Sequence, residues 1–227
     1  NGNSAVGYAA LGAATTGNYN VAMGYQALLT NVDGDRNVAI GASALQTLDP
    51  SSNVDMYNVA VGHSAGLALT TGIKNTFIGG ESGDATTTAD ANTAVGYGSL
   101  GANTTGTSNT AVGAYALDAT DDGYNNAAVG AYALSANCGH SNVAMGYFAL
   151  VANTADNNTG IGTSALAANT TGADNTAVGS SALLDATTGA RNTALGTSAG
   201  ANLTTGDDNT ALGRAALFTA TTVSDLV

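Results

Sequence analysis

The sequence predicts an all-β protein, a parallel β-solenoid or β-roll built from about thirteen repeats of 17 residues. Three observations predict this class. An asparagine recurs at a nearly constant spacing, a glycine follows four residues after each of these asparagines, and an aliphatic residue or methionine stands three residues after each of them. A fixed period of this length is typical of arrays in which each unit buries its apolar side only against its neighbours.

The recurring asparagines define the repeats. Nine of the twelve intervals between them are 17 residues long, two are 16 and one is 21. We number each repeat from its asparagine as position 0, and the repeats form one predicted domain over residues 1–227. They start at Asn3, Asn20, Asn37, Asn58, Asn75, Asn92, Asn109, Asn126, Asn142, Asn158, Asn175, Asn192 and Asn209. In stacked coils these side chains either bond to one another in a ladder or cap a turn through their own backbone, and both roles are structural.

Positions 1 to 3 predict a short strand. Position 1 is Thr, Ser or Val in all repeats but one, and position 2 is Ala except at Phe77 and Gly160. Because side chains alternate along a strand, we expect position 2 to fill a narrow interior and positions 1 and 3 to face neighbouring chains. The position 3 residues are the predicted repeat core, and they are Val6, Met23, Ile40, Val61, Ile78, Val95, Val112, Val129, Met145, Ile161, Val178, Leu195 and Leu212.

A second apolar pair, usually Ala-Leu, stands at positions 7 and 8. Gly replaces the leucine at Gly66, Gly83 and Gly200, and a Thr-Thr-Gly or Asp-containing turn signal follows near positions 12 to 14. We predict two short strands per coil, joined by tight turns and stacked in parallel. A helix is the alternative for the Ala-Leu segment, but about eight residues are available, fewer than the ~12 that an unsupported helix needs.

The 21-residue interval contains the only proline of the chain, Pro50. An insertion of about residues 47–57 is expected to leave the stack intact and to project from a turn as a loop. It is interpreted as a tolerated insertion, with a recognition loop as the alternative.

Composition excludes several classes of function. Only 9% of residues are charged and the net charge is -12, with Arg36, Lys74, Arg191 and Arg214 as the only cations. Binding to nucleic acid or to anionic lipid needs clustered Lys and Arg, so neither partner is expected. The apolar runs are far shorter than the ~20 residues of a membrane span, so membrane insertion is not expected.

No catalytic constellation is evident, and we expect no enzyme activity, no cofactor and no metal. His63 and His140 fall at unrelated repeat positions and lack a nucleophile at a distinctive spacing. Carboxylates gather at turns, as at Asp207 and Asp208. Their spacing fits neither the calcium-binding nonapeptide repeat nor the twelve-residue helix-loop-helix motif, so solvated turn residues are favoured over calcium ligands. Cys138, the single cysteine, is expected in a turn position.

Tyrosines recur at positions 5 and 6. Stacked aromatic rings can form a platform for sugars, and the alternative is that they cover the coil edge or an interface between chains. The candidate glycan contacts are Tyr8, Tyr25, Tyr97, Tyr115, Tyr132 and Tyr147.

Asn-Thr-Ala-Val-Gly at 109–113 and 175–179, followed by Ala-Leu and Thr-Thr-Gly, resembles the head repeats of trimeric autotransporter adhesins. It is more similar still to related repeats in phage and viral tail fibres, because the adhesin motif has one more strand residue before its glycine and a shorter repeat. The resemblance covers nearly all of residues 3–217. It implies a homotrimer of left-handed parallel β-rolls lying side by side, with the aliphatic strand residues packed at the threefold axis.

We therefore expect a structural and adhesive fibre segment, the shaft or head of a phage or viral tail fibre that helps attachment to a host surface. A bacterial surface adhesin or extracellular filament subunit is the first alternative, and a monomeric ice- or glycan-binding β-solenoid is the second. The expected location is extracellular, on the virion surface or the bacterial cell surface. The expected partners are copies of the same chain, in a trimer or end to end, and a glycan or protein receptor.

Overall fold

The computed structural model describes residues 2–226, which form two compact units, residues 2–114 and 115–226. Each unit is a parallel β-solenoid in which one repeat makes one coil, and no helix occurs among the described residues. The predicted all-β solenoid with 17-residue spacing is confirmed. Each coil contributes a single strand of three residues to the main sheet of its unit.

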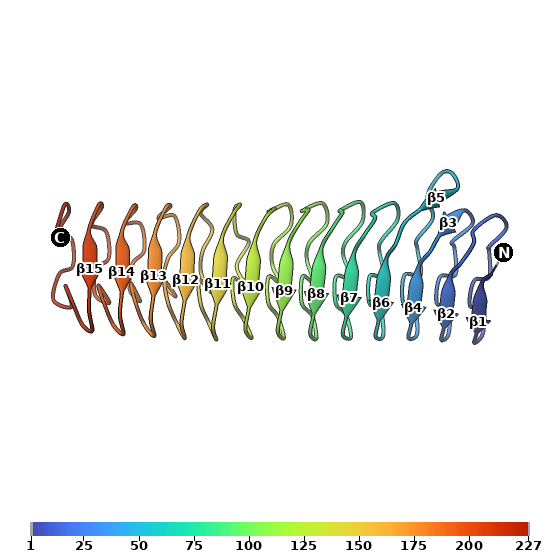
Figure 1. The fold of residues 1–227 in the computed structure, drawn as a ribbon, viewed down its shortest axis with the longest axis horizontal. Coiled ribbons are helices and arrows are strands. Elements are labelled where there is room, and N and C mark those ends of the chain that lie inside the picture. Colours follow the sequence, from blue (N-terminus) through green and yellow to red (C-terminus); the bar gives the residue numbers. More distant parts are fainter. Residues whose placement is uncertain (1, 227) are drawn as a thin grey trace. The chain divides into compact units, whose positions relative to one another are not determined.

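The first unit holds a parallel sheet in the order β1-β2-β4-β6-β7-β8-β9. Equivalent positions of successive repeats pair residue for residue, so that Ala94 lies opposite Ala111. Within this unit the strands stand side by side in chain order (Figure 1). The strands are β1 (Ser4–Val6), β2 (Val21–Met23), β4 (Val38–Ile40), β6 (Val59–Val61), β7 (Thr76–Ile78), β8 (Thr93–Val95) and β9 (Thr110–Val112).

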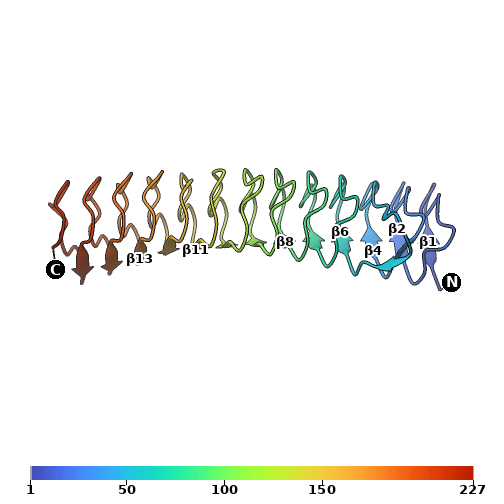
Figure 2. The ribbon, with the colours of Figure 1, turned by 90° about the horizontal axis from the view of Figure 1, so that it is seen from above.

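The second unit repeats this arrangement with β10 (Ala127–Val129), β11 (Val143–Met145), β12 (Thr159–Ile161), β13 (Thr176–Val178), β14 (Thr193–Leu195) and β15 (Thr210–Leu212). The two 16-residue repeats keep the pairing in register, with Val143 opposite Thr159. Their missing residue is therefore taken from the turns and not from the strand. In each unit the strands line one side of the coils and the turn segments lie on the other side (Figure 2).

The interior of each coil is filled by positions 2, 7 and 8. In the coil that begins at Asn20, these residues are Ala22, Ala27 and Leu28, and all three are 0% exposed. Position 0 is also buried in every coil after the first, so the core is a thin column of small apolar side chains and asparagine amides. Positions 1 and 3 point outward from the strand, as the alternation of a strand requires.

The prediction of a second strand at the Ala-Leu pair is wrong. No strand occurs there, and the residues at positions 6 and 8 have left-handed backbone, as at Gln26 with φ 56° and Leu28 with φ 51°. In a strand, Ala27 and Leu28 would point to opposite sides. The alternation of left- and right-handed backbone lets both neighbours face the interior, and the gain from burying them offsets the cost of positive φ in a non-glycine residue.

The glycine at position 4 ends each strand with a positive φ, 137° at Gly179. A Cβ atom there would lie 2.6 Å from the carbonyl oxygen of Gly196 on the next coil. Only glycine therefore allows successive coils to approach this closely.

The insertion lies in the first unit and includes the short strand β5 (Val54–Asp55), which pairs with β3 (Gly34–Asp35). The loop carrying β5 projects beyond the upper edge of the coils in the view of Figure 1. The main sheet continues unbroken beneath it, because β4 pairs directly with β6. The predicted insertion of residues 47–57 is therefore accommodated outside the main sheet.

Candidate functional surface

The outward side of the strands is an uncharged apolar surface in both units. Nine of the thirteen position 3 residues are exposed large hydrophobics, including Met23 at 44%, Met145 at 44% and Leu195 at 47%. Position 1 contributes only Thr, Val, Ser or Ala, each half-buried or exposed. We call positions 1 and 3 of the strands the strand face. Within one chain these residues are not an interior core, and their predicted role as a core between chains stays a prediction.

The asparagine column forms an intercoil ladder. The Asn175 Oδ1 atom accepts the backbone N–H of Asn192 at 2.9 Å, and its Nδ2 donates to the Gly189 carbonyl at 2.8 Å. The same pair of bonds recurs along the column; Asn20 Oδ1, for example, accepts the N–H of Asn37 at 2.8 Å. Of the two predicted roles the structure shows the ladder. The asparagine side chains in it bond mainly to backbone groups of the next coil.

A second buried polar column at position 11 was not foreseen. Asn31 Nδ2 donates to the Gly34 carbonyl at 2.9 Å, and Asn31 Oδ1 accepts the Gly34 N–H at 3.0 Å. Asn153 and Asn169 occupy the same place and bond to each other at 2.6 Å. Position 11 also holds Thr, Ala and Leu, so the sequence carries no constant residue there that would have indicated its burial.

The tyrosine rings stack along the coils in two of the expected places. Tyr8 lies on Tyr25 with ring centroids 5.4 Å apart, and Tyr115 lies on Tyr132 at 5.3 Å. The Tyr97 hydroxyl donates to a Glu81 carboxylate oxygen at 2.7 Å. Five of the six side chains are exposed, and that of Tyr115 is half-buried.

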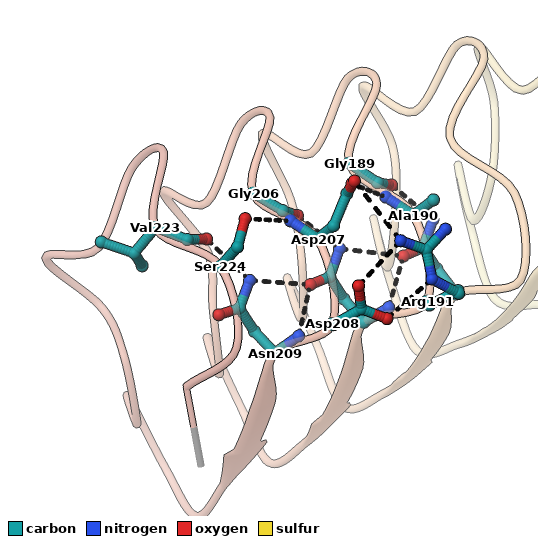
Figure 3. Close-up of polar contacts among 11 residues, drawn as sticks. Gly189, Ala190, Arg191, Gly206, Asp207, Asp208, Asn209, Val223 and Ser224 are labelled. Atoms are coloured by element: carbon teal, nitrogen blue, oxygen red, sulfur yellow. Dashed lines mark hydrogen bonds and ion pairs between the residues drawn. The ribbon is translucent and has the colours of Figure 1, made fainter.

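The turn carboxylates are largely acceptors for the backbone of the preceding coil. Asp207 Oδ1 accepts the Ala190 N–H at 2.8 Å (Figure 3), as Asp90 Oδ1 accepts the Ile73 N–H at 2.8 Å. In Figure 3 the Arg191 guanidinium also meets both oxygens of Asp208, each at 2.7 Å. These hydrogen bonds hold the pKa of Asp208 below its usual value. Both side chains are exposed, so the pair adds little stability.

No group of three or more His, Cys, Asp or Glu side chains able to hold a metal occurs in residues 2–226. The His140 ring stacks on the Tyr124 ring with centroids 3.9 Å apart, and its Nδ1 accepts the backbone N–H of Tyr124 at 3.3 Å. The backbone N–H of His140 donates to Asp156 Oδ1 at 2.7 Å. His63 is exposed at position 5 of its coil. Neither histidine is bonded to a nucleophile.

Three acidic groups have a raised pKa because they are partly or wholly removed from water. Burial raises the pKa of Asp84 and of Asp118. Burial also raises the pKa of Cys138 to about 11, and the thiol lies 3.1 Å from the Thr120 hydroxyl. Cys138 lies outside the strands, and its side chain is buried inside the coil. A protonated, buried thiol is a poor nucleophile.

The insertion carries a cluster of aromatic and charged side chains. The Arg36 guanidinium lies 5.2 Å from the centroid of the Tyr19 ring and 5.7 Å from that of Tyr57, and it pairs with the Asp55 carboxylate. Asn53 Nδ2 links the loop to the two preceding coils by donating to the backbone carbonyls of Thr16 and Asp33, each at 3.1 Å. The loop is thus hydrogen-bonded to the coils. The interpretation as a tolerated insertion and the alternative of a recognition loop both stay predictions.

No protein-family model matches the chain, and no curated protein sequence matches it. In the part of the chain that the structure describes, no helix has the length and apolar character needed to cross a membrane.

Proposed function

We propose that the chain is a structural and adhesive segment of an extracellular fibre, in which three copies pack side by side through the strand face. The fibre is assigned to a phage or viral tail, as a shaft or head that helps the particle attach to its host through a surface glycan or protein. One observation carries the proposal: the strand face presents an aliphatic or methionine side chain on every coil and no charge on any of them.

The strand face is too regular and too apolar to suit a solvated surface. Contiguous exposed apolar patches of more than a few hundred Å² mark interaction surfaces, and covering each Å² contributes about 25 cal/mol. A surface repeated once per coil fits best a partner with the same repeat, which is another copy of the chain. The resemblance to trimeric fibre repeats supports three copies. A bacterial surface adhesin or filament subunit would use the same packing and is the nearest alternative.

The proposed role is mechanical and adhesive, without catalysis. Neither His63 nor His140 is hydrogen-bonded to a nucleophile among the described residues. A net charge of -12 disfavours nucleic acid as a partner. The thin hydrogen-bonded coils give reach, and the edge residues and the insertion supply contact points for a receptor.

The native mass in solution tests the proposal. Light scattering after size exclusion should give about three times the chain mass of 21.9 kDa. Met145→Lys places a charge on the strand face and should lower the mass, whereas Thr171→Lys, at an exposed turn, should leave it unchanged. A labelled trimer should also remain bound to intact cells of its host after washing. A wild-type chain that is monomeric at every concentration would overturn the proposal.

A second candidate follows from the threonines of the second unit. Thr159, Thr176, Thr193 and Thr210 occupy position 1 of four consecutive strands and point outward. An uninterrupted row of hydroxyls beside aliphatic residues is a surface that could bind ice if the chain is a monomer. Thermal hysteresis of the solution, lost in Thr193→Lys, would support this candidate.

A further inference from the structure

The six candidate tyrosines differ in how much of the ring is free. A sugar stacks its C–H groups on the face of an aromatic ring, where the π-electron density lies. The planes of Tyr8 and Tyr25 differ by 12°, and those of Tyr115 and Tyr132 by 17°. These rings turn their faces toward each other along the coils, and so they present mainly their edges to the solvent.

Tyr97 and Tyr147 both have small neighbours at position 5, but the Tyr97 hydroxyl is bonded to the charged Glu81. The neighbours of Tyr147 are Ala131 on the preceding coil and Thr163 on the following coil. Within residues 2–226, the only ring that Tyr147 contacts is Phe148, at 4.1 Å between centroids and tilted by 53°. Tyr147 is 49% exposed. No ring of an adjacent coil stacks on it, so its faces are more open than those of the stacked pairs.

Tyr147 lies beside a packed aromatic ring, Phe148, and close to hydroxyl groups that have no hydrogen-bond partner within the described residues. The Phe148 ring stacks on the Tyr132 ring with centroids 5.4 Å apart, and this packing restricts its movement. The hydroxyls of Tyr147 and Thr163 make no hydrogen bond within the described residues, and Thr163 is exposed. Positions 5 and 6 of this coil and the next are Tyr147, Phe148, Thr163 and Ser164, none of them charged.

We infer that Tyr147, Phe148 and Thr163 form a binding site for a neutral pyranoside, which stacks on the Tyr147 ring and bonds to the Thr163 hydroxyl. The inference rests on the proposed attachment function and names the chemistry of its receptor. A flat ring with hydroxyl donors beside it matches a sugar, whose C–H face is apolar and whose rim is polar. Coils repeat about every 4.8 Å, so Thr163 stands roughly one sugar width from Tyr147.

A second copy of the chain is the competing occupant, and the position of Tyr147 argues against it. The residue follows Gly146, whose φ of 138° ends the strand. Tyr147 therefore lies beyond the strand face through which the copies are proposed to pack. The residue after it on the same coil edge is Thr163, where a contact between chains would favour an apolar side chain.

Saturation-transfer NMR with the methyl β-glycosides of galactose, glucose and N-acetylglucosamine tests the inference on the full chain. At least one glycoside should receive saturation at the C–H protons of one ring face. Tyr147→Ala should reduce this transfer at least fivefold, and Thr163→Val should reduce it less. Tyr25→Ala removes an exposed tyrosine that is stacked on Tyr8 and should leave the transfer unchanged.

The native mass is measured on the same samples, which separates the two proposals. A wild-type trimer that binds host cells but shows no transfer from any of the three glycosides overturns only the sugar site. Equal transfer in the wild type and Tyr147→Ala overturns it as well. A fall in mass caused by Tyr147→Ala would show that the ring is a subunit contact and not a sugar site. A monomeric wild type overturns the proposed fibre instead, whatever the glycosides show.

Discussion

The ring of Phe77 occupies the space that a side chain at Gly83 would need. A Cβ atom at Gly83 would lie 2.5 Å from Phe77 Cε1, and one at Gly66 on the preceding coil would lie 2.8 Å from Cδ2. Phe77 stands where most repeats have alanine, and both glycines stand where most have leucine. The Phe77 ring thus occupies space that leucine side chains fill in other coils.

We predict that Gly83→Leu destabilises the wild type but not a chain that lacks the Phe77 ring. The φ of 59° at Gly83 is one that leucine adopts in other coils, so overpacking is the main cost, about 1–3 kcal/mol. Phe77→Ala alone should cost about 3–5 kcal/mol because it leaves a cavity. Urea unfolding of both single variants and the double variant checks this. Additive free energies would contradict it, because the double variant should be more stable than their sum implies.

Gly179→Ala should be far more damaging than Gly213→Ala. Both glycines have positive φ, 137° and 114°, so both substitutions strain the backbone. Only at Gly179 would the new Cβ meet the next coil, 2.6 Å from the carbonyl oxygen of Gly196. At Gly213 nothing lies within 4 Å of it. We expect an additional loss of more than about 3 kcal/mol at Gly179. Similar melting temperatures for the two variants would show that close approach of the coils is not what requires glycine.

Asn175→Ala removes one step of the ladder. The substitution leaves the Asn192 N–H and the Gly189 carbonyl without their partners inside the coil. Each orphaned buried group costs about 1–3 kcal/mol, so we expect a loss of about 2–5 kcal/mol. Amide hydrogen exchange should show the largest loss of protection at Asn192, and Thr171→Ala at an exposed turn serves as the control. Unchanged exchange at Asn192 would mean that the ladder does not hold the coils together.

The thiol of Cys138 should be inert in the folded chain. Its pKa of about 11 leaves almost no thiolate at pH 8, and alkylation should become fast only in denaturant. The folded pKa is raised above the usual value of 9.0, so the folded state holds the proton more tightly than the unfolded state. The unfolding free energy should therefore fall as pH rises from 9 to about 11. Cys138→Ala should lack this part of the pH dependence, and an equal slope in both proteins would contradict the burial.

The fold could be predicted because the same strand and turn pattern recurs in thirteen repeats. A strand of three residues is visible at β9 because Thr110 and Val112 alternate with a small residue and are bounded by asparagine and glycine. The Ala-Leu segment could not be placed by the same rule. Two adjacent buried residues, such as Ala27 and Leu28, need a backbone that departs from strand alternation, and local propensity does not reveal left-handed leucine.

The candidate surfaces were only partly foreseeable. The exceptions Phe77, Gly66 and Gly83 were visible, but their mutual contact depends on how consecutive coils stack. The distinction between Tyr147 and the stacked tyrosines likewise depends on which residue occupies position 5 one coil before and one coil after. Repeat position indicates that a side chain lies at the coil edge, whereas the orientation of each ring is a property of its neighbours.

The residue-for-residue register between successive strands has an evolutionary consequence. Each coil bonds to the coils directly before and after it, so duplication of one 17-residue block supplies both the new surfaces and their complements. The gene can lengthen or shorten the protein in whole coils, each worth about 4.8 Å of reach, without a compensating change elsewhere. Selection can then adjust how far a contact point stands from its anchor by copying sequence, while single residues such as Tyr147 vary independently to change what is touched.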